Sequence, residues 1–238
     1  MTEPLIPGAK FPITGFFIGK LIQINGRPSG YGKTASPPGT VITINKDGIV
    51  GDEHTKIHGG PDRVINHYNA NHYTRLIKNF PRAKPTLFVP GFGENISTGT
   101  NTDGLELNEN NVCIGDVFRL GTVLLQVCQP REPCSKVDKW HKCTAQSSLK
   151  NYLVKAAMTG WFYRVLEEGV ITIGDNSEIE FVSRINPEWP LARIVTSIQT
   201  AKAKSNSSPE FLSAVLGLDE LAYKPWKQRV EKWLENKQ

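Results

Sequence analysis

The stretch from Val112 to Lys136, VCIGDVFRLGTVLLQVCQPREPCSK, combines short β-like segments with a polar loop. Its β-branched and leucine residues predict strands at 112–114, 117–120 and 123–129, and a Gly-Asp pair at 115–116 is typical of a turn. Many short strands at regular spacing with few helices indicate a closed or nearly closed β-barrel. The same composition predicts further strands at 16–24, 41–44, 64–68, 161–166, 170–173 and 179–182.

The loop that ends this stretch, Gln129–Lys136, presents a single thiol on a stiff backbone. Pro130 and Pro133 fix their own φ angles and favour an extended conformation in the residue before each. Arg131 and Lys136 flank Cys134, and nearby cations favour the thiolate, which attacks electrophiles or binds soft metals. We therefore take Cys134 as the candidate chemical centre. The alternative is that Cys134 is a small buried hydrophobic residue.

Length, composition and charge limit the class of protein. At 238 residues with 39% hydrophobic and 21% charged residues, the chain is one large domain, or one domain with a small appendage. A formal charge of +5 suits an anionic ligand or an acidic partner, but it falls short of a dedicated nucleic-acid binder. The four cysteines form no Cys-x-x-Cys pair, which argues against a structural zinc site. With no export signal and no apolar run of ~20 residues, the expected location is the cytoplasm, not a membrane.

Two other polar stretches are candidate ligand loops. In His58-Gly59-Gly60-Pro61-Asp62-Arg63 the paired glycines can turn successive N–H groups toward an oxyanion, and the arginine adds a fork of donors. The alternative is a simple turn. His54 and His58 have the spacing of helical metal ligands, but the glycines and proline that follow argue against a helix. In the second stretch, Gly91–Asn95, the amide of Asn95 could read the edge of a ring.

Helices are predicted at 70–79 and at 144–157, the latter with Thr144 as its N-cap. The composition changes at a linker around 186–190, beyond which prolines and apolar stripes predict three short helices. Three short helices form only a small core, so we expect them to pack on the barrel or on another subunit. The predicted division is a barrel domain at 1–186 and a three-helix appendage at 187–238.

Four motifs occur in a fixed order: HGGPDR at 58–63, GFGEN at 91–95, QPREPC at 129–134 and GWFYRVL at 160–166. Together they resemble the MOSC domain (molybdenum cofactor sulfurase, C-terminal), and in particular its bacterial YiiM-like branch. The helical tail from WPLAR at 189–193 resembles the three-helix appendage of that branch. The resemblance implies a mainly β fold with helices, a MOSC-type β-barrel followed by the small three-helix C-terminal appendage.

The resemblance also implies the molybdenum cofactor (Mo-molybdopterin), in which a phosphorylated pterin holds the metal through a dithiolene. The metal-ligating cysteine of the family corresponds to Cys134. Val64 and Asn66 depart from the residues that relatives commonly carry beside the first motif. The cofactor-binding positions that the resemblance suggests are His58, Gly59, Gly60, Arg63, Asn95, Arg131 and Arg164.

The function that the resemblance implies is reduction of N-hydroxylated compounds, such as hydroxylamino purines, to amines. Cys134 would ligate the metal. A proton must also reach the departing oxygen, and His58 and Asp62 are the nearest candidates in the sequence. The chain has no dinucleotide-binding G-x-G-x-x-G and no iron–sulfur cysteine set, so a separate electron-donor reductase is expected as a partner. A homo-oligomer is left open. The alternative function is a non-redox carrier of the cofactor, or of a persulfide on Cys134.

Overall fold

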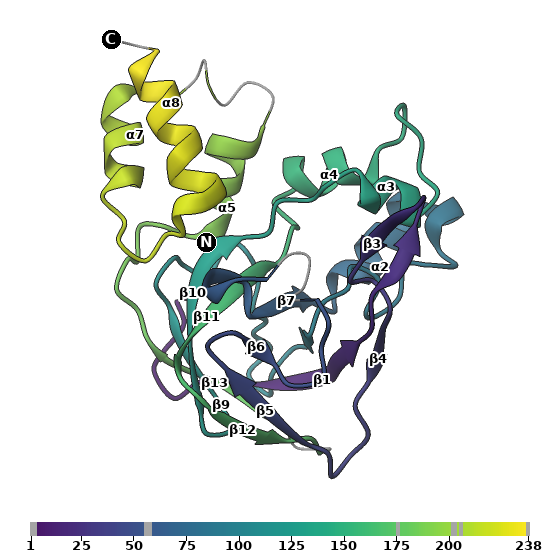
Figure 1. Ribbon diagram of the computed structural model, residues 1–238. Helices are drawn as coiled ribbons and strands as arrows, with labels where there is room; N and C mark the ends of the chain where they lie inside the picture. The colour runs from purple at the N-terminus through teal and green to yellow at the C-terminus, as the bar shows by residue number, and fades with distance from the viewer. Residues whose placement is uncertain (1–3, 55–58, 175–176, 201–203, 205–206, 237–238) are drawn as a thin grey trace.

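The computed structural model describes residues 4–54, 59–174, 177–200, 204 and 207–236. Its main feature is an eight-stranded sheet of order β13-β9-β10-β11-β7-β8-β1-β4 (Figure 1). Because β13 also pairs with β1, seven strands close into a barrel and β4 extends it at one edge. The strands are β1 (Lys10–Gly19), β4 (Lys33–Ala35), β7 (Ile65–Asn69), β8 (Ile96–Thr98), β9 (Val117–Leu120), β10 (Val123–Pro130), β11 (Trp161–Glu167) and β13 (Glu178–Ser183).

Neighbouring strands run antiparallel except β7 and β8, which are parallel. The barrel interior is filled by aromatic and β-branched side chains, with Phe11, Phe118 and Tyr163 at 0% exposure. Strand β10 is buried along almost its whole length, because one face points into the barrel and the other is covered. The barrel prediction is therefore confirmed, and β10 leads directly into the cysteine loop.

The local predictions hold best for strands with a clear apolar pattern. The predicted strand at 16–24 is instead the end of β1 followed by a hairpin of β2 (Ile22–Ile24) and β3 (Arg27–Ser29). The prediction of a strand at 112–114 is wrong. These residues form a turn instead of a strand ladder, and the Asp116 carboxylate closes the turn by accepting a hydrogen bond from the Cys113 N–H. A small separate sheet contains β5 (Val41–Asn45), β6 (Gly48–Ile49) and β12 (Gly169–Thr172).

Short helices cover one end of the barrel. Helix α2 (His72–Asn79) lies within its predicted range, and α3 (Lys136–Trp140) follows the cysteine loop without having been predicted. Helix α4 (Leu149–Lys155) begins later than expected, because Ser148 and not Thr144 is its N-cap, accepting from the N–H of Asn151. Two 3₁₀ turns, η1 (Pro61–Arg63) and η2 (Pro81–Ala83), complete this region.

The C-terminal helices pack on the barrel beside the upper end of β10 (Figure 1). Ser208 caps α7 (Pro209–Leu216), and the side chains of Leu191, Ile194 and Trp226 join the barrel core. The division between 1–186 and 187–238 stays a prediction. Among the described residues no helix is long and apolar enough to cross a bilayer. The tail elements are α5 (Leu191–Ile194), η3 (Val195–Gln199), α7 (Pro209–Leu216), η4 (Tyr223–Lys227) and α8 (Gln228–Glu235).

Candidate active site

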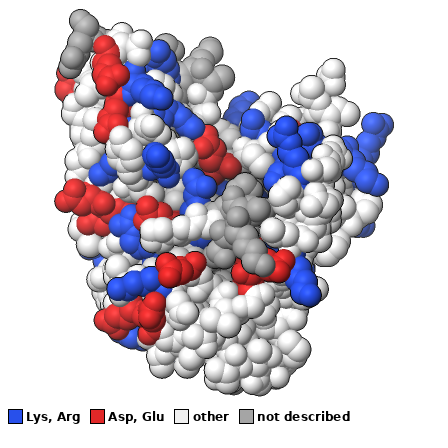
Figure 2. All heavy atoms as spheres, viewed as in Figure 1, with Lys and Arg blue, Asp and Glu red and all other residues white. Residues whose placement is uncertain are grey.

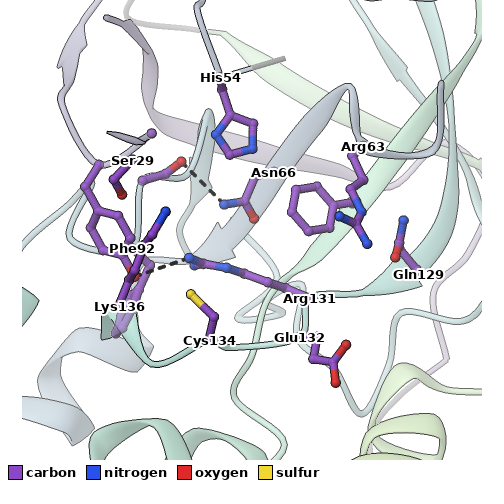
Figure 3. A pocket seen from close by; sticks show the side chains of 14 residues that line it. Ser29, His54, Arg63, Asn66, Phe92, Gln129, Arg131, Glu132, Cys134 and Lys136 are labelled. Carbon is purple, nitrogen blue, oxygen red and sulfur yellow. Dashed lines mark hydrogen bonds between the residues drawn. The ribbon is translucent and has the colours of Figure 1, made fainter. Parts of the chain in front are cut away.

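A pocket of about 220 Å³ lies between the barrel end and the cysteine loop (Figure 3). Segments far apart in the sequence line it: the β3–β4 turn, η1 and β7, the GFGEN loop, and the end of β10 with the loop after it. Of the predicted site residues, the structure brings together Arg63, Arg131 and Cys134. These three come from two of the four family-like motifs.

Cys134 is exposed, and its sulfur points into the pocket toward Arg131 (Figure 3). The loop is fixed on both sides of it, because Arg131 N donates to Gly160 O at 2.8 Å and Val137 N donates to Cys134 O at 3.1 Å. By contrast, Cys128 is fully buried, and burial raises the pKa of its thiol to about 12. The alternative of a buried structural Cys134 is therefore wrong.

Arg131 lies across the base of the pocket against two aromatic rings. Its guanidinium is 5.9 Å from the ring centre of Tyr31 and 6.0 Å from that of Phe92, and it donates to the Tyr31 hydroxyl at 3.4 Å. Burial alone would lower the pKa of Arg131, but the neighbouring Tyr31, Cys134 and Glu94 together raise it. Arg131 therefore keeps its charge in a partly desolvated position, where a cation binds an anion more strongly than it does in water.

Two further cations line the pocket. The Arg63 guanidinium is 6.0 Å from the ring centre of Phe162 and has no carboxylate partner among the described residues. Lys136 donates to the carbonyl of Pro28 at 2.6 Å. The one acidic side chain among the described lining residues, Glu132, is paired with Arg229 of the tail. The pocket therefore offers positive charge to an anionic ligand.

The GFGEN loop is anchored by its buried acid. Glu94 is 0% exposed and accepts from the Tyr73 hydroxyl at 2.7 Å and from the Phe92 N–H at 3.0 Å. Burial raises the pKa of Glu94. Gly93 has φ +67°, and a Cβ there would lie 2.7 Å from the carbonyl oxygen of Gly30. This loop needs glycine because its backbone packs closely against the β3–β4 turn, and both segments line the pocket.

A buried polar network stands behind the pocket wall. Lys33 and Asp52 form an ion pair at 2.8 Å with side chains that are only 1% and 4% exposed. Asn95 donates to the same carboxylate at 2.7 Å and to Phe17 O at 3.0 Å. Its amide oxygen accepts from the N–H of Asn66 at 3.1 Å. The amide of Asn95 is therefore used within the protein, and the predicted contact with a ligand ring does not fit this geometry.

These observations can be set beside known proteins. The family model of the MOSC domain matches residues 54–178, more than half of the chain. The chain belongs to the MOSC domain family. Protein YiiM of Escherichia coli K12 is 36% identical over 163 residues, covering 68% of this chain and 67% of that protein. A protein of Gibberella moniliformis named "Reductase" is 34% identical over 170 residues, covering 69% of this chain but 28% of that protein.

Solved structures agree on the fold of this MOSC protein. YiiM from Geobacillus stearothermophilus superposes with a TM-score of 0.71 at 25% identity, covering 94% of this chain and 99% of that one. YiiM from E. coli gives a TM-score of 0.73 at 24% identity, covering 97% and 94%. The predicted resemblance and the predicted fold class are thus confirmed, and the chain is a molybdenum-cofactor-related MOSC protein.

The structure places several predicted site residues of this MOSC protein outside the pocket. Arg164 and Asp62 form an ion pair with each other at 2.8 Å, and neither lines the cavity. The Asp62 carboxylate is therefore not the free proton donor for which its place in the sequence made it a candidate. Gly59 and Gly60, both described, do not line the cavity either. His58 lies outside the described residues.

Several lining residues were not predicted. Tyr31 lies between Gly30 and Gly32, the same glycine–aromatic–glycine pattern that marks Phe92, so this signal could have found it. Asn66 was noted only as a departure from the family pattern. No local signal marks the Lys33–Asp52 pair, because its partners are 19 residues apart in the chain and meet only in the folded state. The other lining residues that were not predicted as site residues are Ser29, Gly30, His54, Phe92, Gly93, Gln129, Glu132, Lys136 and Phe162.

Proposed function

We propose that this protein binds the molybdenum cofactor in the pocket and reduces N-hydroxylated compounds to amines. The observation that carries the proposal is the exposed Cys134 thiol inside a pocket with Arg63, Arg131 and Lys136. A thiolate is a soft ligand suited to molybdenum, and arginine forks suit a phosphate. The residues present therefore fit the cofactor that the family implies.

Each part of the pocket has a defined task in this proposal. When bound, the cofactor supplies a metal that takes up an oxygen atom and changes oxidation state. Cys134 holds the metal, and its stiff loop fixes where the sulfur lies. Arg63 and Arg131 hold the phosphate. The Phe92 and Phe162 rings lining the pocket exclude water from the buried side.

Tyr31, in the described part of the pocket, is a candidate proton donor for the departing oxygen. Burial raises the pKa of Tyr31 to about 12, so its hydroxyl keeps its proton at neutral pH. Tyr31 therefore acts as a hydrogen-bond donor toward a bound substrate, and not as a base. His58 stays a prediction for the same task.

Electrons come from a separate reductase in this proposal. On the face shown in Figure 2, Lys and Arg gather without acidic neighbours around helices α2 to α4, whereas both signs are mixed over the tail. A one-sign patch suits an acidic electron-donor protein. The name "Reductase" of the longer Gibberella relative supports a redox role, and this chain spans 28% of that protein.

The test is metal content together with turnover. Full-length protein is purified from a host that makes the cofactor, and molybdenum per chain is measured by metal analysis. Reduction of 6-hydroxylaminopurine by a chemically reduced dye is then followed. We expect close to one molybdenum per chain and product formation that requires Cys134. Protein that holds molybdenum but forms no amine contradicts the reductase.

The second candidate, a sulfur or cofactor carrier, is favoured by the same exposed thiol. Intact-mass measurement separates the two functions. One additional sulfur on Cys134 without molybdenum supports the carrier, whereas bound molybdenum with amine formation supports the enzyme.

A further inference from the structure

Asn66 carries a buried amide oxygen that lacks a hydrogen-bond partner. The residue is 2% exposed, it lines the pocket, and no described residue donates to its Oδ1 atom. Leaving a buried acceptor unpaired is costly, and an unpaired acceptor on a residue that lines a pocket can be paired by a donor from a ligand.

The structure fixes which end of the Asn66 amide faces the pocket. Asn95 holds the Asn66 backbone from both sides, donating to its carbonyl at 2.7 Å and accepting from its N–H at 3.1 Å. The Asn66 Nδ2 group donates to the carbonyl of Gly93 at 3.4 Å (Figure 3). A carbonyl oxygen only accepts, so rotating the amide would place two acceptors against each other. The oxygen therefore points into the cavity.

The surroundings of this oxygen describe the ligand. Arg63 and Arg131 line the same pocket and bind an anionic group, and the Phe92 and Phe162 side chains offer apolar contact to a flat ring. A bare anion satisfies the cations but leaves Asn66 unpaired. A ligand that satisfies every group combines an anion, a ring and an N–H donor.

We propose that Asn66 Oδ1 accepts a hydrogen bond from a heterocyclic N–H of the ligand, beside the anionic group held by Arg63 and Arg131. This inference rests on the proposed function and deepens it, because it names the feature of the ligand that the pocket selects. The N–H belongs either to the pterin of the cofactor or to a purine-like substrate. Both present the same donor chemistry, and experiment separates them.

The direct test uses two fluorescent probes and full-length protein from a host that cannot make the cofactor. Pterin-6-carboxylate carries N–H donors, whereas 1,3-dimethyllumazine-6-carboxylate has the same ring system and anion without them. We expect Asn66→Leu to weaken pterin-6-carboxylate binding about tenfold, the effect of losing one good hydrogen bond. Binding of the dimethylated probe should not weaken.

Asn69→Leu is the matched control. Asn69 lies on the same strand, is 0% exposed and does not line the pocket. Its replacement should leave both affinities unchanged. If Asn66→Leu does not fold, as judged by thermal unfolding, Asn66→Ala takes its place. Equal weakening of both probes, no weakening of either, or no binding of the pterin probe by the unmodified protein overturns the inference.

A second arm identifies the source of the N–H. Protein from a cofactor-producing host is assayed for pterin per chain and for KM and kcat with 6-hydroxylaminopurine. A fall in pterin content in Asn66→Leu assigns the N–H to the cofactor. An unchanged content with about a tenfold higher KM assigns it to the substrate.

The two proposals fail separately. Selective probe binding by a protein that never holds molybdenum contradicts the reductase and leaves the Asn66 inference standing. Normal reduction by Asn66→Leu, with normal pterin content and probe affinity, overturns the inference alone.

Discussion

The two walls of the pocket are held in place by different means. The barrel wall, which carries Arg63 and Asn66, is backed by the buried Lys33–Asp52 ion pair and by Asn95. The cysteine wall, which carries Arg131 and Cys134, has its own backbone hydrogen bonds and is held in addition by the C-terminal tail. Three tail side chains reach it: Trp226 donates to Gln129 at 3.2 Å, Gln199 donates to Arg131 O at 3.1 Å, and Arg229 pairs with Glu132.

Because of this difference, we expect the barrel wall to affect mainly the stability of the fold and the cysteine wall to affect mainly the chemistry of the thiol. A buried ion pair is costly to break, because the remaining charge stays in a low dielectric. The tail contacts are mostly partly exposed, so each contributes less to stability. Changes behind the barrel wall should therefore act mainly on folding. Changes at the cysteine wall should act mainly on the thiol and on what it holds.

Removing the thiol should separate the effect on chemistry from the effect on stability most clearly. Cys134→Ala should lower molybdenum content and turnover by two orders of magnitude or more, with the melting temperature changed by less than about 2 °C. The reason is that an exposed loop thiol contributes little packing. Metal analysis and calorimetry measure the two effects. The matched control is Cys143→Ala, a partly buried cysteine outside the pocket, which should keep both activity and metal. Retention of molybdenum by Cys134→Ala contradicts the assigned metal ligand.

Breaking the buried ion pair is the converse experiment. Asp52→Ala leaves the Lys33 ammonium buried without its carboxylate, which should lower the free energy of unfolding by about 3–5 kcal/mol. Urea unfolding measures the change. Asp47→Ala, an exposed carboxylate, should be nearly neutral. A loss below about 1 kcal/mol in Asp52→Ala would show that water reaches the pair and that the barrel wall is no stiffer than the other.

Acid should weaken the barrel wall through His67, the neighbour of Asn66 on β7. Burial lowers the pKa of His67 from 6.5 to about 3. Between these values the unfolded chain binds more protons than the native protein, so stability falls as pH drops below about 6.5, and the loss is complete near pH 3. The slope contributed is at most about 1.4 kcal/mol per pH unit. Urea unfolding at pH 7 and pH 4.5 measures it, and His67→Gln should have a shallower slope. An unchanged slope in that variant rules out His67 as the source.

A change in the tail should cost less stability than loss of the buried ion pair. Trp226→Phe removes the N–H that pairs with the buried Oε1 of Gln129, at a cost of about 1–3 kcal/mol. Because Gln129 lines the pocket and is the first residue of the cysteine loop, the rate of Cys134 alkylation should also change. Trp233→Phe, a partly buried tail residue, is the control for both measurements. Alkylation at the unmodified rate in Trp226→Phe, despite a loss of stability, would show that the tail does not position the thiol.

The sequence was informative where the signal is local. The apolar patterns of β9, β10 and β11 and the two prolines around Arg131 are properties of neighbouring residues, so the barrel and the stiff cysteine loop could be predicted. The hairpin of β2 and β3 was missed, because its Gly- and Pro-rich sequence is typical of a loop and pairing alone makes it a strand pair. Helix α3 is only five residues long, too short for a clear helical period.

The sequence by itself determined a closed barrel of short strands, a rigid loop with one thiol among cations, and a helical tail. Tertiary structure decided which polar residues share the pocket. Asn66 and Asn95 carry the same amide, yet Asp52, 43 residues before Asn95 in the chain, binds one of them and leaves the oxygen of the other facing the cavity. Such assignments depend on which distant segments meet, and short-range sequence patterns carry no record of those contacts.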